Sequence, residues 1–106
     1  MINNKFGLSE NSLKSILSVL SINTKIKSAR IYGSRAMRNY REGSDIDLVL
    51  IGDELSTTDL LKIENDLDDL LLPYKIDLAL LHQIKNEDLK NHIKNFSVLI
   101  YSSQLN

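Results

Sequence analysis

A Gly-Ser pair and two closely spaced aspartates are the residues of this sequence best suited to chemistry. Gly33 and Ser34 are separated by ten residues from the segment Asp45-Ile46-Asp47. A Gly-Ser turn offers backbone N–H groups and a hydroxyl to phosphate oxygens. Two carboxylates spaced two apart on a strand point to the same face, and magnesium prefers such oxygen ligands. The spacing therefore predicts a site that binds the phosphates of a nucleoside triphosphate and holds metal beside them.

A third carboxylate, Asp77, lies in a later apolar segment. In-line attack on an α-phosphate needs positioned reactants and neutralised charge, and two metal ions can stabilise the attacking and leaving oxygens together. We expect Asp45 and Asp47 to bridge two magnesium ions, with manganese as an alternative. Asp77 is expected to complete one metal site and to help take the proton from an attacking hydroxyl. The predicted reaction is nucleotidyl transfer.

The predicted nucleotide-binding residues are Gly33, Ser34, Arg35 and Arg41. An arginine beside several carboxylates either contacts phosphate or pairs with the acids, and both readings stay open for Arg35 and Arg41.

The two histidines and two of the tyrosines stand close to these segments in the sequence. His82 follows the strand of Asp77 and is expected in a loop, while His92 is expected to be a packed or interface residue. Both tyrosines could line a base pocket. Tyr32 is expected in the core instead, and the assignment of Tyr40 stays open.

The elements that must position these residues are short helices and strands. Apolar spacing and capping residues predict helices over 9–21, 56–71 and 86–96, and one helical turn at 36–38 that begins at the Gly-Ser pair. In the last of these helices the residues expected to face the core are Leu89, Ile93 and Phe96. Alternation predicts strands over 27–32, 45–51 and 74–81, with a further short strand at 98–101. On the second strand the apolar and acidic residues take opposite faces. This pattern predicts a core on one side of a sheet and a site on the other.

Composition favours one small domain spanning residues 1–106. The chain is 42% hydrophobic and carries 13 basic and 14 acidic residues, so its net charge of −1 argues against general attraction to nucleic acid. There is no cysteine, no signal-like start and no long apolar run, so a cytoplasmic protein without membrane contact is expected. The element order predicts an α+β fold with a mixed sheet and helices packed mainly on one face.

The segments Ile31-Tyr32-Gly33-Ser34-Arg35-Ala36 and Ser44-Asp45-Ile46-Asp47-Leu48 carry a family resemblance, which Asp77 extends. On these residues the chain resembles the minimal nucleotidyltransferases of the DNA polymerase beta superfamily. The resemblance implies a polymerase beta-like fold, ATP as substrate and divalent metal. It also implies AMP transfer to a tyrosine of a helical HEPN-type toxin partner, for which this chain would be the antitoxin.

One position departs from the family pattern. Arg38 stands where relatives carry a glycine that ends the short helix, and Asn39 is expected to take the left-handed conformation instead. If the loop is impaired, a second reading applies, in which the chain masks its partner without catalysis. A third reading is nucleotidylation of a small molecule such as an aminoglycoside.

Overall fold

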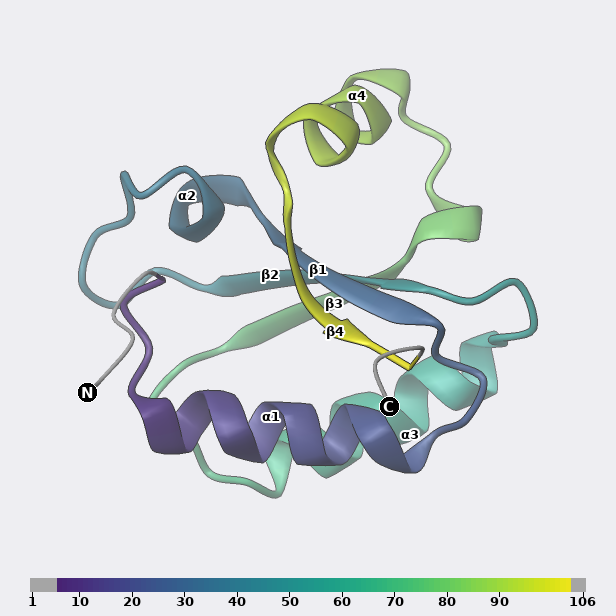
Figure 1. Cartoon of the computed structure of the whole chain (residues 1–106), viewed down its shortest axis with the longest axis horizontal. Helices are drawn as coiled ribbons and strands as arrows, with labels where there is room; N and C mark the ends of the chain where they lie inside the picture. The colour runs from purple at the N-terminus through teal and green to yellow at the C-terminus, as the bar shows by residue number, and fades with distance from the viewer. Residues whose placement is uncertain (1–5, 104–106) are drawn as a thin grey trace.

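The strands form one sheet, and helices lie on both of its faces (Figure 1). The computed structural model describes residues 6–103. In chain order the elements are α1 (Glu10–Ile22), β1 (Ser28–Tyr32), α2 (Gly33–Ala36), β2 (Ile46–Ile51), α3 (Thr57–Asp68), β3 (Ile76–Leu80), the 3-10 turn η1 (Leu81–Gln83), α4 (Glu87–Phe96) and β4 (Val98–Ser102).

The four strands form one mixed sheet with the order β3-β2-β1-β4. β2 and β3 are parallel, with α3 as the crossover between them, and β1 is antiparallel to both β2 and β4. Parallel pairing brings the starts of β2 and β3 to the same end of the sheet. The predicted α+β class and mixed sheet are confirmed, and so is the final short strand.

The two faces of the sheet carry different helices. The main core lies on the side of α1 and α3, while α2 and α4 lie on the opposite side (Figure 1). Strand alternation directs Ile46, Leu48 and Leu50 into this core, as predicted. Val49 and Ile93 are also buried but lie outside the main cluster, and they belong to the side of α4. The sheet therefore separates the core from the face that carries the aspartates.

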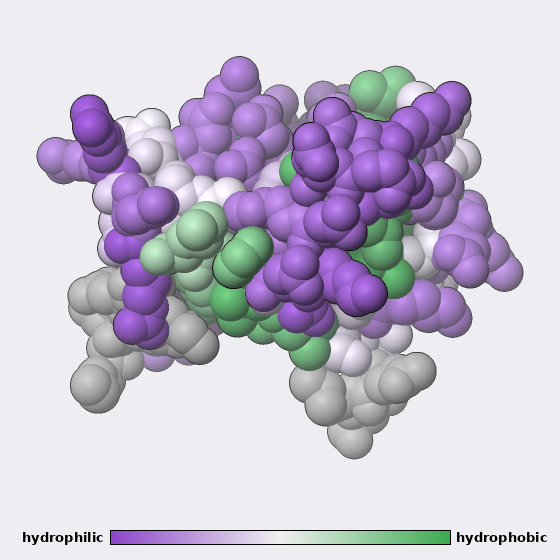
Figure 2. Space-filling model, turned by 90° about the horizontal axis from the view of Figure 1, so that it is seen from above, coloured by the Kyte–Doolittle hydropathy of each residue, from purple (hydrophilic) through white to green (hydrophobic). Residues whose placement is uncertain are grey.

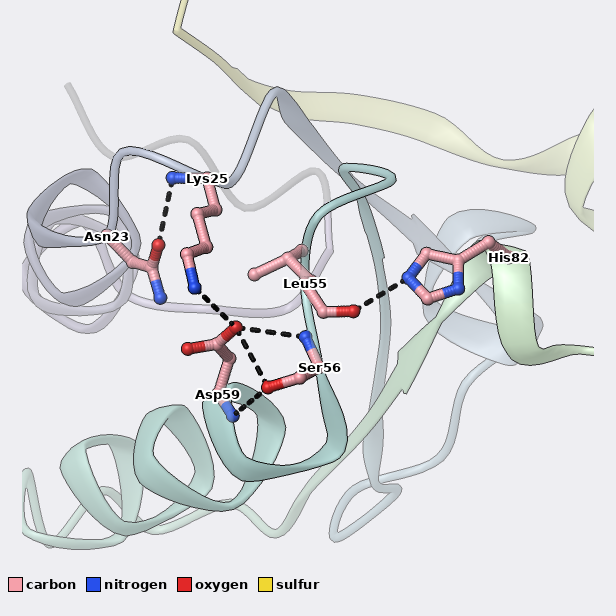
Figure 3. A network of polar contacts seen from close by, with 6 residues as sticks. All are labelled: Asn23, Lys25, Leu55, Ser56, Asp59 and His82. Atoms are coloured by element: carbon pink, nitrogen blue, oxygen red, sulfur yellow. Dashed lines mark hydrogen bonds and ion pairs between the residues drawn. The ribbon is translucent and has the colours of Figure 1, made fainter.

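The crossover helix α3 is anchored at its start by a local polar network (Figure 3). The Ser56 hydroxyl accepts from the Asp59 backbone N–H at 3.1 Å, and the Asp59 carboxylate accepts from the Ser56 N–H at 2.9 Å, which makes a capping box. Lys25 pairs with the same carboxylate at 3.2 Å. These contacts fix the end of β2 remote from its aspartates.

The last helix differs from the prediction at its C-terminal end. Phe96 was expected to face the core, yet its side chain is 53% exposed. The reason is that α4 lies on the side of the sheet away from the main core and buries Ile93 there instead.

Within residues 6–103, each helix is too short or too polar to cross a membrane.

Candidate functional site

Three neighbouring strands bring a tyrosine and two aspartates into one row. Tyr32 at the end of β1 is the register partner of Asp47 near the start of β2, and Asp47 is the register partner of Asp77 on β3. Register partners on adjacent strands direct their side chains to the same face. Asp47 is half-buried, whereas Asp77 is exposed. The two predicted carboxylates on different strands are therefore brought side by side.

Asp45 joins this row from the residue before β2. The Ile46 N–H donates to the Lys75 carbonyl at 2.8 Å, which begins the pairing of β2 with β3 directly after Asp45. Asp45 is half-buried and acts electrostatically on Asp47, as Asp77 does. Asp45 and Asp77 thus both lie within electrostatic reach of Asp47.

The crowding of these carboxylates changes the acidity of the site. The pKa of Asp47 is raised above its ordinary 3.8, first by desolvation and then by the charges of Asp77 and Asp45, while His92 acts in the opposite direction. The pKa of the Tyr32 hydroxyl is also raised, by burial and then by Asp47 and Asp77. Negative charge therefore accumulates on this face, and an added cation would relieve it.

The donors present fit a hard divalent cation in kind. Three carboxylates offer the oxygen ligands that magnesium takes, and their mutual repulsion favours a cation among them. Among residues 6–103, however, no three acidic, histidine or cysteine side chains already stand in a metal-holding cluster. The role of Asp45, Asp47 and Asp77 as metal ligands stays a prediction.

Gly33 lies directly against the Asp47 carboxylate. Its φ is +75°, a backbone conformation that favours glycine. A Cβ at this position would collide with Asp47 Oδ2. The absence of a side chain is therefore what lets the turn after β1 approach the acidic row.

Ser34 follows in the first turn of α2 and is half-buried. Its carbonyl accepts from the Asn39 N–H at 3.1 Å, and the Gly33 carbonyl accepts from the Met37 N–H at 3.2 Å. The predicted helical turn thus exists and begins at the Gly-Ser pair as expected, but α2 already ends at Ala36, short of the predicted 38. The phosphate-binding role of Gly33 and Ser34 stays a prediction.

The end of α2 corrects one expectation. Arg38 itself has a left-handed φ of +64°, and Asn39 does not, so the expected shift of this conformation to Asn39 is wrong. The hydrogen bond from the Arg38 N–H to the Arg35 carbonyl, at 3.3 Å, belongs to this tight ending. The loop therefore keeps its short length and places a non-glycine residue in a conformation that glycine prefers.

Arg35 has an interior role that sequence reasoning did not foresee. The residue is 2% exposed, and its guanidinium donates to the carbonyls of Phe6 and Ser44 at 2.7–3.2 Å. It also lies 5.0 Å and 5.1 Å from the ring centres of Tyr40 and Tyr74. Because these contacts occupy the guanidinium, the geometry favours a structural role over the predicted contact with nucleotide. The ring of Tyr40 thus packs against the Arg35 guanidinium.

Arg41 is exposed, and its backbone closes a turn with Ser44. The Arg41 N–H donates to the Ser44 hydroxyl at 2.9 Å, and the Arg41 carbonyl accepts from the Ser44 N–H at 3.0 Å. Its nucleotide-binding role stays a prediction.

His82 lies in η1, where its Nε2 donates to the Leu55 carbonyl at 2.9 Å (Figure 3), so it belongs to the opposite end of β3 from Asp77.

Two residues of the site face were not predicted there. Tyr32 was expected in the core but is half-buried on the acidic face, beside Asp47. His92 reaches the site from α4, and its Nε2 accepts from the Gly33 N–H at 3.1 Å. Strand phase could have identified Tyr32, since it alternates with the apolar residues Ala29 and Ile31 that enter the core. No sequence spacing pointed to His92, which is 59 residues from its partner.

Replacing Arg38 with glycine should stabilise the fold by about 1 kcal/mol, because a left-handed non-glycine residue carries strain of that order. Urea unfolding measures the change. Leu71→Gly is the matched control, since Leu71 has a φ of +55° and is 88% exposed beyond α3. Both variants should gain stability. A loss in Arg38→Gly alone would mean that the arginine side chain contributes more than its backbone costs.

Comparison with known proteins places these features in context. The sequence profile of the family described as "Polymerase beta, Nucleotidyltransferase" matches residues 14–106. "Putative protein adenylyltransferase MJ1217" of Methanocaldococcus jannaschii is 35% identical over 83 residues, covering 77% of this chain and 84% of that protein. "Putative protein adenylyltransferase MJ0126" of the same organism is 36% identical over 77 residues, covering 72% and 78%.

Solved structures share the fold at lower identity. A chain of a toxin–antitoxin crystal structure with AMP-PNP superposes with a TM-score of 0.69 at 19% identity, covering 92% of this chain and 76% of that one. A chain from the complex of a tri-AMPylated Shewanella oneidensis HEPN toxin with its MNT antitoxin gives 0.66 at 16% identity, covering 90% and 73%. The shared architecture thus extends over nearly all of the present chain.

Proposed function

Because this chain belongs to the polymerase beta nucleotidyltransferase family, we propose that it transfers AMP from ATP to a tyrosine hydroxyl of a helical, HEPN-type partner protein and so acts as an antitoxin. The names of its relatives support the reaction, since both are protein adenylyltransferases by name. The observation that carries the proposal is the alignment of Asp47 with Asp77, with Asp45 and Gly33 beside them.

The proposed reaction breaks the phosphoanhydride bond between the α- and β-phosphates of ATP and forms a phosphoester bond to the acceptor. The acceptor oxygen attacks the α-phosphorus of ATP, the new O–P bond forms, and the bond to the bridging oxygen breaks to release pyrophosphate. Asp77 is the most accessible of the three carboxylates and is proposed to take the proton that the acceptor hydroxyl loses. Ser34 is proposed to donate to phosphate oxygens at the turn that Gly33 brings next to Asp47.

Asp45, Asp47 and Asp77 are the residues proposed to hold a divalent cation such as Mg²⁺. When bound, that cation would supply neutralisation of the charge that develops on the phosphate oxygens. The raised pKa of Asp47 supports this assignment, because desolvation and then the charges of Asp77 and Asp45 disfavour its ionised form, which a bound cation would favour. Use of ATP makes the cytoplasm the proposed location.

A protein acceptor is supported by the surface around the site. The face with α2 and α4 is largely hydrophilic, but apolar side chains gather along one part of it (Figure 2). Large exposed apolar residues on this side are Met37 at the end of α2, Phe96 at the end of α4 and Leu99 on β4. Exposed apolar side chains beside a polar site are typical of a surface that meets another protein.

Labelled ATP tests the proposed reaction directly. The protein would be incubated with magnesium and with a helical, HEPN-type protein as candidate partner, using ATP labelled at the α- or the γ-phosphate. We expect covalent label on the partner from the α position only, and loss of that label when the acceptor tyrosine is changed to phenylalanine. Transfer of γ label would indicate phosphorylation. Neutralisation of the partner without any label would support masking.

A further inference from the structure

The helix α4 is attached firmly to the site face although it carries none of the aspartates. Its Ile93 is buried on the sheet, and the Arg30 guanidinium of β1 donates to the Ser97 hydroxyl at 2.6 Å and to the Ser97 carbonyl at 3.2 Å. Arg30 and Tyr32 alternate on the same face of β1. These contacts hold α4 against β1, the strand that leads into Gly33.

From this position His92 makes one directed contact with the site. Its Nε2 accepts the Gly33 N–H at 3.1 Å, so the neutral ring must carry its proton on Nδ1. The ring meets Tyr32 edge-on, with centroids 6.2 Å apart, and packs against Phe96 at 5.6 Å. The imidazole is thus held between two aromatic side chains with its acceptor nitrogen directed at the turn.

Gly33 is therefore fixed from two sides. His92 binds its amide, and the Asp47 carboxylate lies where a Cβ would otherwise stand. A change in the Gly33 peptide would move Ser34, the next residue, relative to the acidic row. Small displacements of positioning groups are costly in sites of this kind.

We propose that His92 is a positioning residue, whose neutral imidazole fixes the Gly33 amide and thereby sets the spacing between the Gly-Ser turn and the Asp47 carboxylate for nucleotide binding. This inference rests on the proposed function for its consequence, but its contact can be measured without any transfer reaction. A histidine ring that carries protons on both nitrogens has no free lone pair. Only the neutral ring, with its proton on Nδ1, can accept the hydrogen bond from the Gly33 amide.

The test compares two substitutions of His92 in the whole chain. His92→Gln keeps a side-chain acceptor, whereas His92→Leu keeps apolar volume and removes the acceptor. Hydrogen exchange of the Gly33 amide is followed by NMR, and the Kd for AMP-PNP with magnesium is measured by calorimetry. Ser97→Ala is the control, because it removes one hydrogen bond of α4 to Arg30 but keeps the bond from Arg30 to the Ser97 carbonyl, so α4 and the His92 contact to Gly33 stay in place.

We expect the Gly33 amide to be protected in the native protein, Ser97→Ala and His92→Gln, and to exchange freely in His92→Leu. His92→Leu should raise the Kd about tenfold, the equivalent of one hydrogen bond, while His92→Gln restores most of the affinity. Equal protection in His92→Leu would overturn the proposal. Unchanged or tighter binding in His92→Leu, or an equal loss in Ser97→Ala, would also overturn it.

Failure of the native protein to bind AMP-PNP would count against the proposed nucleotidyl transfer. In that case the exchange of the Gly33 amide still decides whether His92 holds the turn. The two ideas therefore fail separately.

Discussion

Asp47→Asn should reduce AMP transfer by at least about a hundredfold while leaving the fold intact. The substitution keeps the shape of the side chain but removes the charge at the centre of the row formed by Tyr32, Asp47 and Asp77. Loss of one preorganised electrostatic contact at a reacting centre has effects of this size. Transfer is measured as α-label incorporated into the partner, and circular dichroism verifies the fold.

The same substitution should stabilise the protein at neutral pH in the presence of a chelator. Folding raises the pKa of Asp47 above 3.8, so the folded chain binds this proton more tightly than the unfolded chain. The free energy of unfolding then falls as pH rises from 3.8 through the folded pKa. Asn removes that cost. Urea unfolding should show the gain at about pH 7 and no gain at about pH 3.

Asp59→Asn is the matched control because the sign of its effect is opposite. Hydrogen bonding to the Ser56 backbone, and then to Lys25, lowers the pKa of Asp59. Its stabilisation is present above 3.8 and is lost as pH falls through the lower folded value, so Asn should destabilise at neutral pH without affecting transfer. If Asp47→Asn still neutralised the partner fully, masking would replace catalysis as the explanation.

Gly33→Ala should be damaging both to stability and to activity. The left-handed φ of +75° costs a non-glycine residue about 1–2 kcal/mol, and the added Cβ would collide with Asp47 Oδ2. Relief of that collision requires the turn or the carboxylate to move. A displacement near 1 Å can cost about a hundredfold in rate, so we expect transfer to fall at least that far.

Gly43→Ala separates the two causes. Gly43 also has a left-handed φ, of +87°, but nothing lies within 4 Å of the position that its Cβ would take. It should therefore lose a similar amount of stability in urea unfolding and keep its transfer activity. Equal loss of activity in both variants would show that backbone strain, and not the contact with Asp47, explains the effect of Gly33→Ala.

The parts of the site that alternate along a strand could be predicted from the sequence. The apolar residues Ile46, Leu48 and Leu50 enter the core, and this places Asp47 on the other face by simple geometry. The capping residues Ser9 and Ser56 also begin helices as expected. These features depend on near neighbours in the chain, which is why pattern alone sufficed.

Features that depend on distant contacts could not be read in this way. Arg35 can be buried because the carbonyls of Phe6 and Ser44 accept hydrogen bonds from its guanidinium, and Phe6 lies 29 residues away in the sequence. His92 reaches Gly33 across 59 residues, and nothing in the spacing of α4 distinguishes it from a packing histidine. Leu71 takes a left-handed conformation, and α3 ends at Asp68, short of the predicted 71.

The order of the strands has a consequence for synthesis on the ribosome. β1 lies between β2 and β4, and β4 follows every other element in the sequence. A nascent chain that has emerged only through β3 already carries all three aspartates, but one edge of β1 is still unpaired and exposed to other strands. The Gly33 amide also lacks its imidazole partner until α4 has emerged. In a translating chain the turn at Gly33 and the free edge of β1 therefore gain their last contacts only after α4 and β4 have been made, and until then β1 can pair with a wrong strand.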